Sequence, residues 1–173
     1  MDENRLITLA TRGDGDAFCE IYGKYKDRLY RYAYYRLGDA YMAEDAVSDC
    51  ILEAYRGIGK LKEPAAFPAW IFRILRRCVS KKLDEMIKQK NVIPFDSANV
   101  DEKFSEEEDA IARRLTVMEA LGRLGEEDRE IVLMATVLGQ TSNEIAEITG
   151  LAPGSVRSRL SRDLSKLREL IGE

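Results

Sequence analysis

The stretch TSNEIAEITGLAPGSVRSRLSRD, residues 141–163, decides the fold of the C-terminal part of the chain. Thr141 and Glu144 form a T-x-x-E pattern, which predicts a capping box at the start of a short helix. Gly150 stands where that helix should end, because glycine accepts the left-handed conformation that closes many helices. A Pro-Gly turn follows, and Ser155 is expected to cap the next helix. Two helices joined by a tight turn predict a helix-turn-helix.

The second of these helices has an apolar face and a polar face. Successive residues of an α-helix are rotated by about 100° around its axis, which places the apolar side chains of this segment on one side. These side chains are Val156, Leu160, Leu164, Leu167 and Ile171. Three serines and Arg162 fall opposite, with Arg157 and Arg159 at the edges. Small serines let a DNA groove approach, and arginines at the edges suit phosphates. An amphipathic surface helix without a DNA role would also be polar outside, but the cap, turn, serines and arginines together favour DNA binding.

The charge of the chain is unevenly distributed. Its 173 residues carry a formal net charge of −4. Residues 68–90 nevertheless hold seven basic side chains against two acidic ones, and residues 155–168 hold five against one. Between them, residues 96–109 hold seven acids against one base, which predicts a flexible acidic linker. A solvated linker without a further role explains this run equally well. Two basic segments on an acidic chain indicate nucleic-acid binding.

Helical periodicity runs through most of the chain, so the sequence predicts an all-α fold. Helices are expected at Ala17–Leu37, Ala40–Arg56, Phe67–Lys88, 110–122 and 126–138, followed by the two helices described above. The expected organisation is two small helical domains, residues 1–90 and 110–173, joined by the flexible acidic linker at residues 91–109.

Several function classes lack the residues they need. The chain has no histidine, so Ser–His and Cys–His catalytic pairs are absent, and no phosphate-binding glycine loop is present. Cys19, Cys50 and Cys78 lie far apart, which disfavours a metal site and predicts buried thiols. We therefore expect a protein without enzymatic activity, cofactor or metal. No apolar run is long enough for a bilayer and no signal peptide is evident, which predicts a cytoplasmic protein without membrane insertion.

A second candidate DNA-binding element is AFPAWIFRILRRCVSKKL, residues 66–83. It places aromatic side chains within about a turn of arginines, a combination that suits single-stranded or distorted nucleic acid because bases stack on the rings. The same aromatics can also belong to a core: we expect this for Phe67, while Trp70 fits either role equally. Alone this element is weak evidence, but with a helix-turn-helix it is stronger.

Taken in order, these segments resemble an extracytoplasmic-function (ECF) sigma factor of the sigma-70 family. FCEIYGKYKDRLYRYAYYRLGD (18–39), AEDAVSDCILEAYR (43–56) and FPAWIFRILRRCVSKKL (67–83) resemble the sigma-2 domain. LGRLGEEDREIVLMATVLGQTSNEIAEITGLAPGSVRSRLSRDLSKLREL (121–170) resembles the sigma-4 domain throughout. The resemblance covers nearly the whole chain. A helix-turn-helix alone is shared with many regulators, whereas this ordered set is specific.

The resemblance implies a transcription initiation factor that brings core RNA polymerase to promoter DNA. By analogy, sigma-4 reads the −35 element, and the matching positions are Ser155, Val156, Arg157, Ser158, Arg159, Ser161 and Arg162. Sigma-2 recognises and opens the −10 element, and the matching positions are Trp70, Arg73, Arg76 and Arg77, with the 57–66 loop as a pocket for an unstacked base. Such a pocket offsets a flipping cost of a few kcal/mol.

The resemblance also implies protein partners. The helix at residues 44–55 matches the surface that docks on the polymerase, with Asp45, Ser48, Asp49 and Glu53 as its polar positions. An anti-sigma factor is a further expected partner. Two positions depart from the family pattern: Arg77 and Lys81 stand where asparagine and aspartate are common, so the −10 preference is open. The histidine that the family often has near Ser161 is also absent.

Two other functions stay open at the level of sequence. A stand-alone helix-turn-helix regulator would bind duplex operator DNA tightly without polymerase. An interaction protein would use its basic helices against an acidic protein, and Arg157→Ala with Arg162→Ala would leave DNA-dependent transcription unchanged. The sequence also leaves open whether the two domains pack together, for example with the acidic linker against the basic helices at low ionic strength.

Overall fold

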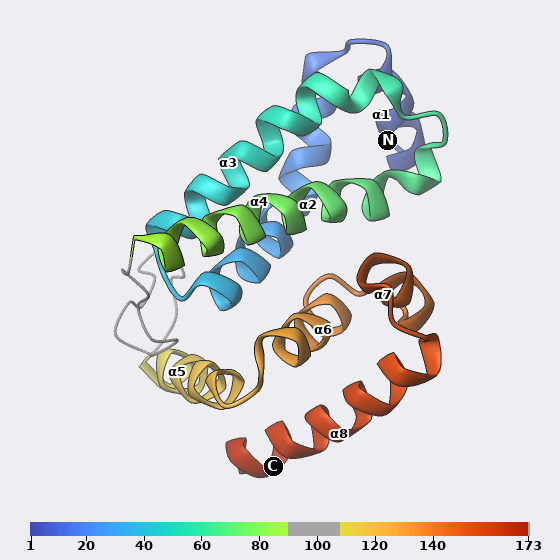
Figure 1. The fold of residues 1–173 in the computed structure, drawn as a ribbon. Helices are drawn as coiled ribbons and strands as arrows, with labels where there is room; N and C mark the ends of the chain where they lie inside the picture. Colours follow the sequence, from blue (N-terminus) through green and yellow to red (C-terminus); the bar gives the residue numbers. More distant parts are fainter. Residues whose placement is uncertain (90–107, 173) are drawn as a thin grey trace.

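The computed structural model describes residues 1–89 and 108–172 and is helical throughout this part, with no strand among these residues (Figure 1). The helices are α1 (Glu3–Thr11), α2 (Gly15–Leu37), α3 (Ala40–Gly57), α4 (Phe67–Lys88), α5 (Glu108–Gly122), α6 (Glu126–Thr136), α7 (Ser142–Thr149) and α8 (Pro153–Ile171), with short 3-10 turns at Ile58–Lys60 and Pro64–Ala66. The predicted all-α fold is confirmed. The linker predicted at residues 91–109 lies outside the described residues, except for its last two, which begin α5.

Helices α1–α4 form the N-terminal unit, in which α2 packs against α1, α3 and α4. Asp14 and Asp39 cap α2 and α3, since each carboxylate accepts a hydrogen bond from a backbone N–H in the first turn. Gly38 closes α2 in the left-handed conformation, with φ of 70°. Phe67 is almost fully buried, as predicted, in a core that includes Leu29 and Leu75.

Helix α1 was not anticipated from the sequence. Leu6, Ile7 and Ala10 form a narrow apolar stripe that is buried against α2. The Tyr25 hydroxyl on α2 donates a hydrogen bond of 2.6 Å to Glu3 on α1. A helix of nine residues is too short to be stable alone, so packing of its three buried apolar residues against α2 stabilises it more than its own propensity does.

Helices α5–α8 form the C-terminal unit, and the helix-turn-helix lies within it. The capping box of Thr141 and Glu144 is confirmed in both directions, and Gly150 ends α7 with φ of 79°. The expected cap at Ser155 is wrong, because α8 begins at Pro153 and Ala152 is the capping residue. Proline suits the first helical position, where its missing N–H would have no partner.

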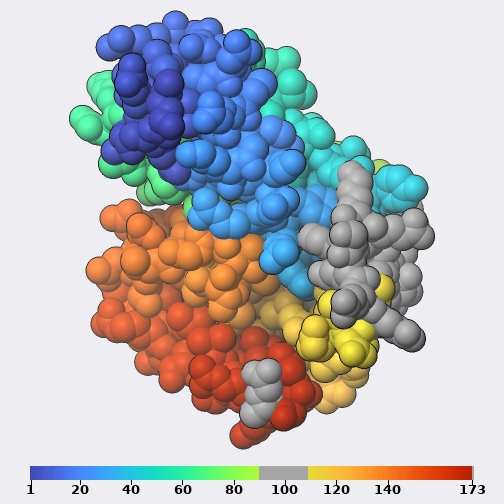
Figure 2. Space-filling model, turned by 180° about the vertical axis from the view of Figure 1, so that it is seen from behind, coloured from blue at the N-terminus to red at the C-terminus, as the bar shows by residue number. Residues whose placement is uncertain are grey.

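The two units pack against each other, with α6 and α7 along α2 and α4 (Figure 1). The atoms of the N-terminal helices (blue) and the C-terminal helices (orange) meet along one seam in Figure 2. Four charged side chains and one tyrosine hydroxyl form hydrogen bonds and ion pairs across this seam. We call this set the inter-unit network, and its members are Tyr32, Arg36, Arg76, Glu126 and Glu130.

The inter-unit network centres on Arg36, which is 4% exposed. Its guanidinium donates to Glu126 at 2.6 Å and to the Tyr32 hydroxyl at 2.8 Å, and it lies 3.4 Å from Glu130. Arg76 on α4 donates to the same Glu130 oxygen. Burial lowers the pKa of Arg36, but the adjoining Tyr32, Glu130 and Glu126 more than reverse this, so its pKa is raised. The guanidinium is therefore charged and matched by carboxylates of the other unit.

Candidate nucleic-acid interface

The polar face of α8 is exposed along its first three turns. Ser155, Arg157, Ser158, Ser161 and Arg162 are exposed and Arg159 is half-buried, as the helical pattern predicted. Val156 is different: its side chain is fully buried, so it belongs to the core beneath the helix and not to the surface that faces solvent. Its place among the candidate contacts is therefore corrected to that of a packing residue.

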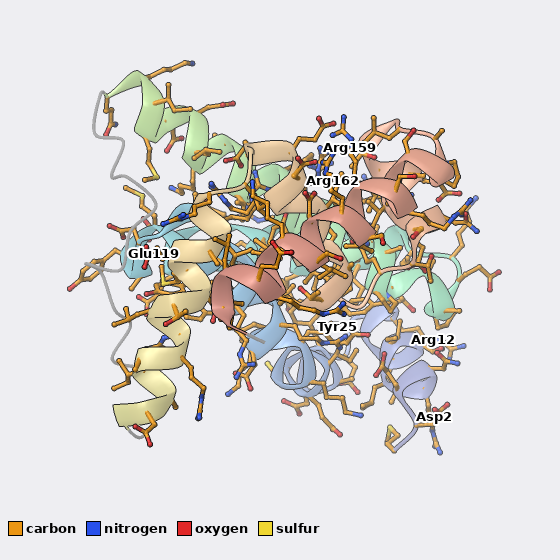
Figure 3. The ribbon with its side chains drawn as sticks, turned by 90° about the horizontal axis from the view of Figure 1, so that it is seen from below. Asp2, Arg12, Tyr25, Glu119, Arg159 and Arg162 are labelled. Carbon is orange, nitrogen blue, oxygen red and sulfur yellow. The ribbon has the colours of Figure 1, made fainter. Side chains whose placement is uncertain are left out.

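Arg159 and Arg162 are held by acidic side chains, and Figure 3 shows the two arginines together on α8. Arg159 donates to Glu127 at 2.8 Å and to Asp128 at 3.4 Å, both in the first turn of α6. Arg162 donates to Asp128 at 3.1 Å and to Asp163 at 3.2 Å. Hydrogen bonding to Glu127 raises the pKa of Arg159. The sequence did not indicate Glu127 and Asp128 as partners, because they precede the two arginines by more than 30 residues.

Arg157 has a different environment. No ion pair joins it to another side chain of residues 1–89 or 109–172. It borders a surface hollow of about 310 Å³, between the start of α7 at Ser142 and the α8 residues Ser161 and Arg168. An exposed cation without an ion pair among these residues, beside a hollow on a helix-turn-helix, is suited to a phosphate.

Helix α4 brings the second set of candidate arginines to the seam between the units. Arg73 and Arg77 are exposed and Arg76 is half-buried. Each has an acidic partner: Arg73 lies 3.6 Å from Glu147 on α7, Arg76 pairs with Glu130 on α6, and Arg77 pairs with Glu53 on α3. Two of the three partners thus come from the C-terminal unit.

Trp70 lies at the start of α4 and is half-buried. Its ring packs on Phe67, with the ring centroids 5.8 Å apart, and it lies close to Gly57, where an added Cβ would come within 3.4 Å of it. One side of the indole is therefore core and the rest is accessible. This intermediate position is compatible with either of the two roles that the sequence left open.

The exposed face of α3 carries the four polar positions expected at the polymerase surface. Asp45, Ser48, Asp49 and Glu53 are all exposed, and Lys82 on α4 lies 4.0 Å from Asp45 and 3.8 Å from Asp49. Three apolar side chains of the same helix, which were not among the predicted contacts, are exposed by more than half: Tyr41, Leu52 and Tyr55. Their positions opposite the buried stripe of α3 were the available signal. A mixed polar and apolar surface of this kind suits a protein partner.

The three cysteines differ in burial. Cys50 and Cys78 are buried, whereas Cys19 is exposed, so the prediction of three buried thiols is wrong for Cys19. Burial raises the pKa of Cys78 to about 11, and it raises the pKa of Cys50 further. Within the described part of the chain, no three Cys, Asp or Glu side chains gather as metal ligands. No described helix is long and apolar enough to cross a bilayer.

Two family matches cover both units of the chain. Residues 21–85 match sigma-70 region 2, and residues 114–167 match sigma-70 region 4. The fold and the paired basic helices therefore define a sigma-70-type factor.

Relatives among known proteins narrow this class. The ECF RNA polymerase sigma factor SigL of Mycobacterium tuberculosis is 31% identical over 160 residues, which are 88% of each chain. SigW of Bacillus subtilis is 27% identical over 176 residues, covering 95% of this chain and 94% of its own. BldN of Streptomyces coelicolor is 29% identical over 96% of this chain, which spans 64% of the BldN length. The chain belongs to the ECF group of RNA polymerase sigma factors, which act in transcription initiation.

Solved structures share the fold. RpoE of Bartonella quintana, in complex with the anti-sigma factor NepR, matches with a TM-score of 0.72 at 23% identity, over 90% of this chain and 96% of its own. CnrH, in complex with the cytosolic domain of CnrY, matches with a TM-score of 0.70 at 22% identity, over 98% of this chain and 97% of its own.

Proposed function

We propose that this sigma factor contacts promoter DNA at two places, with α8 on the −35 element and α4 on the −10 element. The observation that carries this proposal is the exposed face of α8, where serines and arginines cover the second helix of a helix-turn-helix. The protein acts through binding alone, without enzymatic activity of its own, in the cytoplasm where core polymerase works. Its two domains are residues 1–90 and 110–173, joined by the 91–109 linker.

At the −35 element, α8 lies in the major groove with its first turns toward the base edges. Arg157 contacts a phosphate, Arg159 and Arg162 reach the bases, and Ser155, Ser158 and Ser161 allow the close approach. Val156 holds the helix in place from the core side. Arginine is the side chain best suited to paired hydrogen bonds with guanine.

At the −10 element, α4 meets DNA that is being opened. Arg73, Arg76 and Arg77 neutralise phosphates. The accessible side of Trp70 offers a stacking surface for an unstacked DNA base, and the 57–66 loop forms the pocket that receives it. Asp45, Ser48, Asp49 and Glu53 on α3 contact the polymerase, together with the exposed Leu52 and Tyr55.

The packed arrangement of the units is the unbound form. The −35 and −10 elements lie about 25 base pairs apart, or roughly 85 Å of B-form DNA at ~3.4 Å per base pair. Arg76 cannot reach one element while it pairs with Glu130 in the unit that reads the other. Binding to polymerase and promoter therefore requires the units to separate. An anti-sigma partner, as RpoE has in NepR, would keep them from doing so.

In vitro transcription with core polymerase and a library of genomic fragments tests this function and yields the promoter motif. Arg157→Ala with Arg162→Ala should weaken promoter engagement, because a base-reading arginine contributes about 1–3 kcal/mol. Arg113→Ala with Arg123→Ala, which also removes two exposed positive charges from the same unit but lies outside the helix-turn-helix, is the matched control. Failure of holoenzyme to form or initiate would exclude the proposal, and tight operator binding without polymerase would favour a stand-alone regulator.

A further inference from the structure

We infer that Asp128 is a specificity-determining residue, which orients Arg162 and Arg159 so that they read bases and contribute little to non-specific phosphate binding. The inference rests on the proposed role of α8 at the −35 element. Asp128 lies on α6, outside the helix-turn-helix, and acts through the arginines without touching DNA itself. It is therefore a positioning residue.

The geometry at Arg162 fixes the plane of its guanidinium. Its Nε donates to Asp163 and its Nη2 donates to Asp128, so two carboxylates hold it from two sides. The side chain is still 62% exposed, and its Nη1 donates to no other described residue, so hydrogen-bonding capacity is left for a ligand. A surface arginine would otherwise sample many rotamers, at a cost in entropy when one of them is selected by DNA.

Asp163 makes this arrangement persistent. It is only 3% exposed, and its second carboxylate oxygen has no hydrogen-bond partner among the described residues. A buried carboxylate without a partner is strongly disfavoured. Arg162 therefore keeps its bond to Asp163 when DNA approaches, and Asp128 determines which way the rest of the guanidinium points.

Arg159 is held in the same way by the first turn of α6. Its Nη1 donates to Glu127 and lies 3.4 Å from Asp128. Two arginines thus face three carboxylates, those of Glu127, Asp128 and Asp163, so this part of the surface carries no excess positive charge.

When nearby carboxylates offset the charge of two arginines and fix their orientation, the arginines favour hydrogen bonds to bases over attraction to phosphates. Attraction to the backbone depends on net charge and is the same for every sequence. Paired hydrogen bonds to a base edge depend on direction and are lost at the wrong base. Removing the Asp128 charge should therefore increase binding to all DNA while weakening discrimination between sequences.

The test uses holoenzyme assembled with core polymerase and the promoter selected by transcription. Binding is measured for that promoter and for the same fragment with a scrambled −35 element, at several salt concentrations. Asp128→Asn should tighten binding to the scrambled fragment, lower the ratio between the two fragments about 10-fold, and steepen the salt slope by about 1 for each arginine released. Glu127→Gln, which concerns Arg159 alone, should give the same change to a smaller extent.

Glu119→Gln is the matched control. It removes one negative charge from the same unit, but Glu119 lies on α5, apart from the two arginines, and among the described residues its ion pair is with Arg123 (Figure 3). Circular dichroism and melting temperature confirm that each variant is folded. An unchanged ratio in Asp128→Asn would overturn the inference, as would a control that matches it. If Arg157→Ala with Arg162→Ala is also without effect, the proposed role of α8 fails instead.

Discussion

Cys19, Cys50 and Cys78 show how residues of one type acquire different chemistry from their surroundings. Cys50 and Cys78 lie on the packed faces of α3 and α4, and burial raises the pKa of both thiols. Cys19 lies on the outer face of α2. The sequence predicted three buried thiols because free cysteine is usually buried, and that tendency does not identify the side of α2 on which position 19 falls.

Thiol labelling of the native protein should therefore modify Cys19 first. The thiolate is the reactive form, and with a pKa of about 11 Cys78 is protonated at pH 8. Mass spectrometry should find one label per native chain and three after denaturation. Cys19→Ser should abolish the fast reaction, whereas rapid native labelling of Cys78 would contradict the assignment.

At the scale of the element, the sequence predicted a helix end well where the residues that cap it lie within a few positions of that end. The Thr141 box and the glycine at position 150 are local, and both are confirmed. The start of α8 was misplaced by three residues, because both a serine cap at position 155 and a proline in the first helical position, 153, are common ways to begin a helix. Helix α1 was missed because its stability comes from α2 and not from its own sequence.

Thr141→Ala should destabilise α7 by about 1 kcal/mol, because it removes an oxygen that accepts from the Glu144 backbone. Hydrogen exchange resolved to residues 142–149 is the measurement, since it reports on this helix separately. Thr116→Ala is the control: that hydroxyl bonds to Ala112 in the middle of α5, where alanine is a better helix former. Equal protection of α7 in both variants would argue against the cap.

At the scale of the whole molecule, the sequence predicted both helical units but not how they pack. Arg36, Glu126 and Glu130 are charged residues of the kind that is usually solvated on helix surfaces, and only the tertiary structure shows that they face one another. The sequence did identify the two sets of candidate arginines. It could not show that most of them are already paired with acids, and that two of them, Arg73 and Arg76, pair with acids of the opposite unit.

Glu130→Gln should favour separation of the two units by about 2 kcal/mol, because Arg36 and Arg76 both lose a charged acceptor at a buried site. Small-angle scattering should report a larger radius of gyration. Glu147→Gln is the matched control, since its pair with Arg73 also crosses the seam but is exposed and contributes little. Equal radii for Glu130→Gln and the unmodified protein would contradict this account.

The buried position of Arg36 has a consequence for how much of the protein is available at any moment. In the proposed mechanism polymerase binds the open conformer, in which the N-terminal and C-terminal units are separated. If about one molecule in a hundred is open, the apparent affinity of polymerase for the protein is about 100-fold weaker than its affinity for the open conformer. Any ligand that prefers the shut conformer lowers that fraction, and any that prefers the open one raises it. Under the proposed function, the concentration of free polymerase and the packing of the two units against each other within the chain together determine how many promoters this factor occupies.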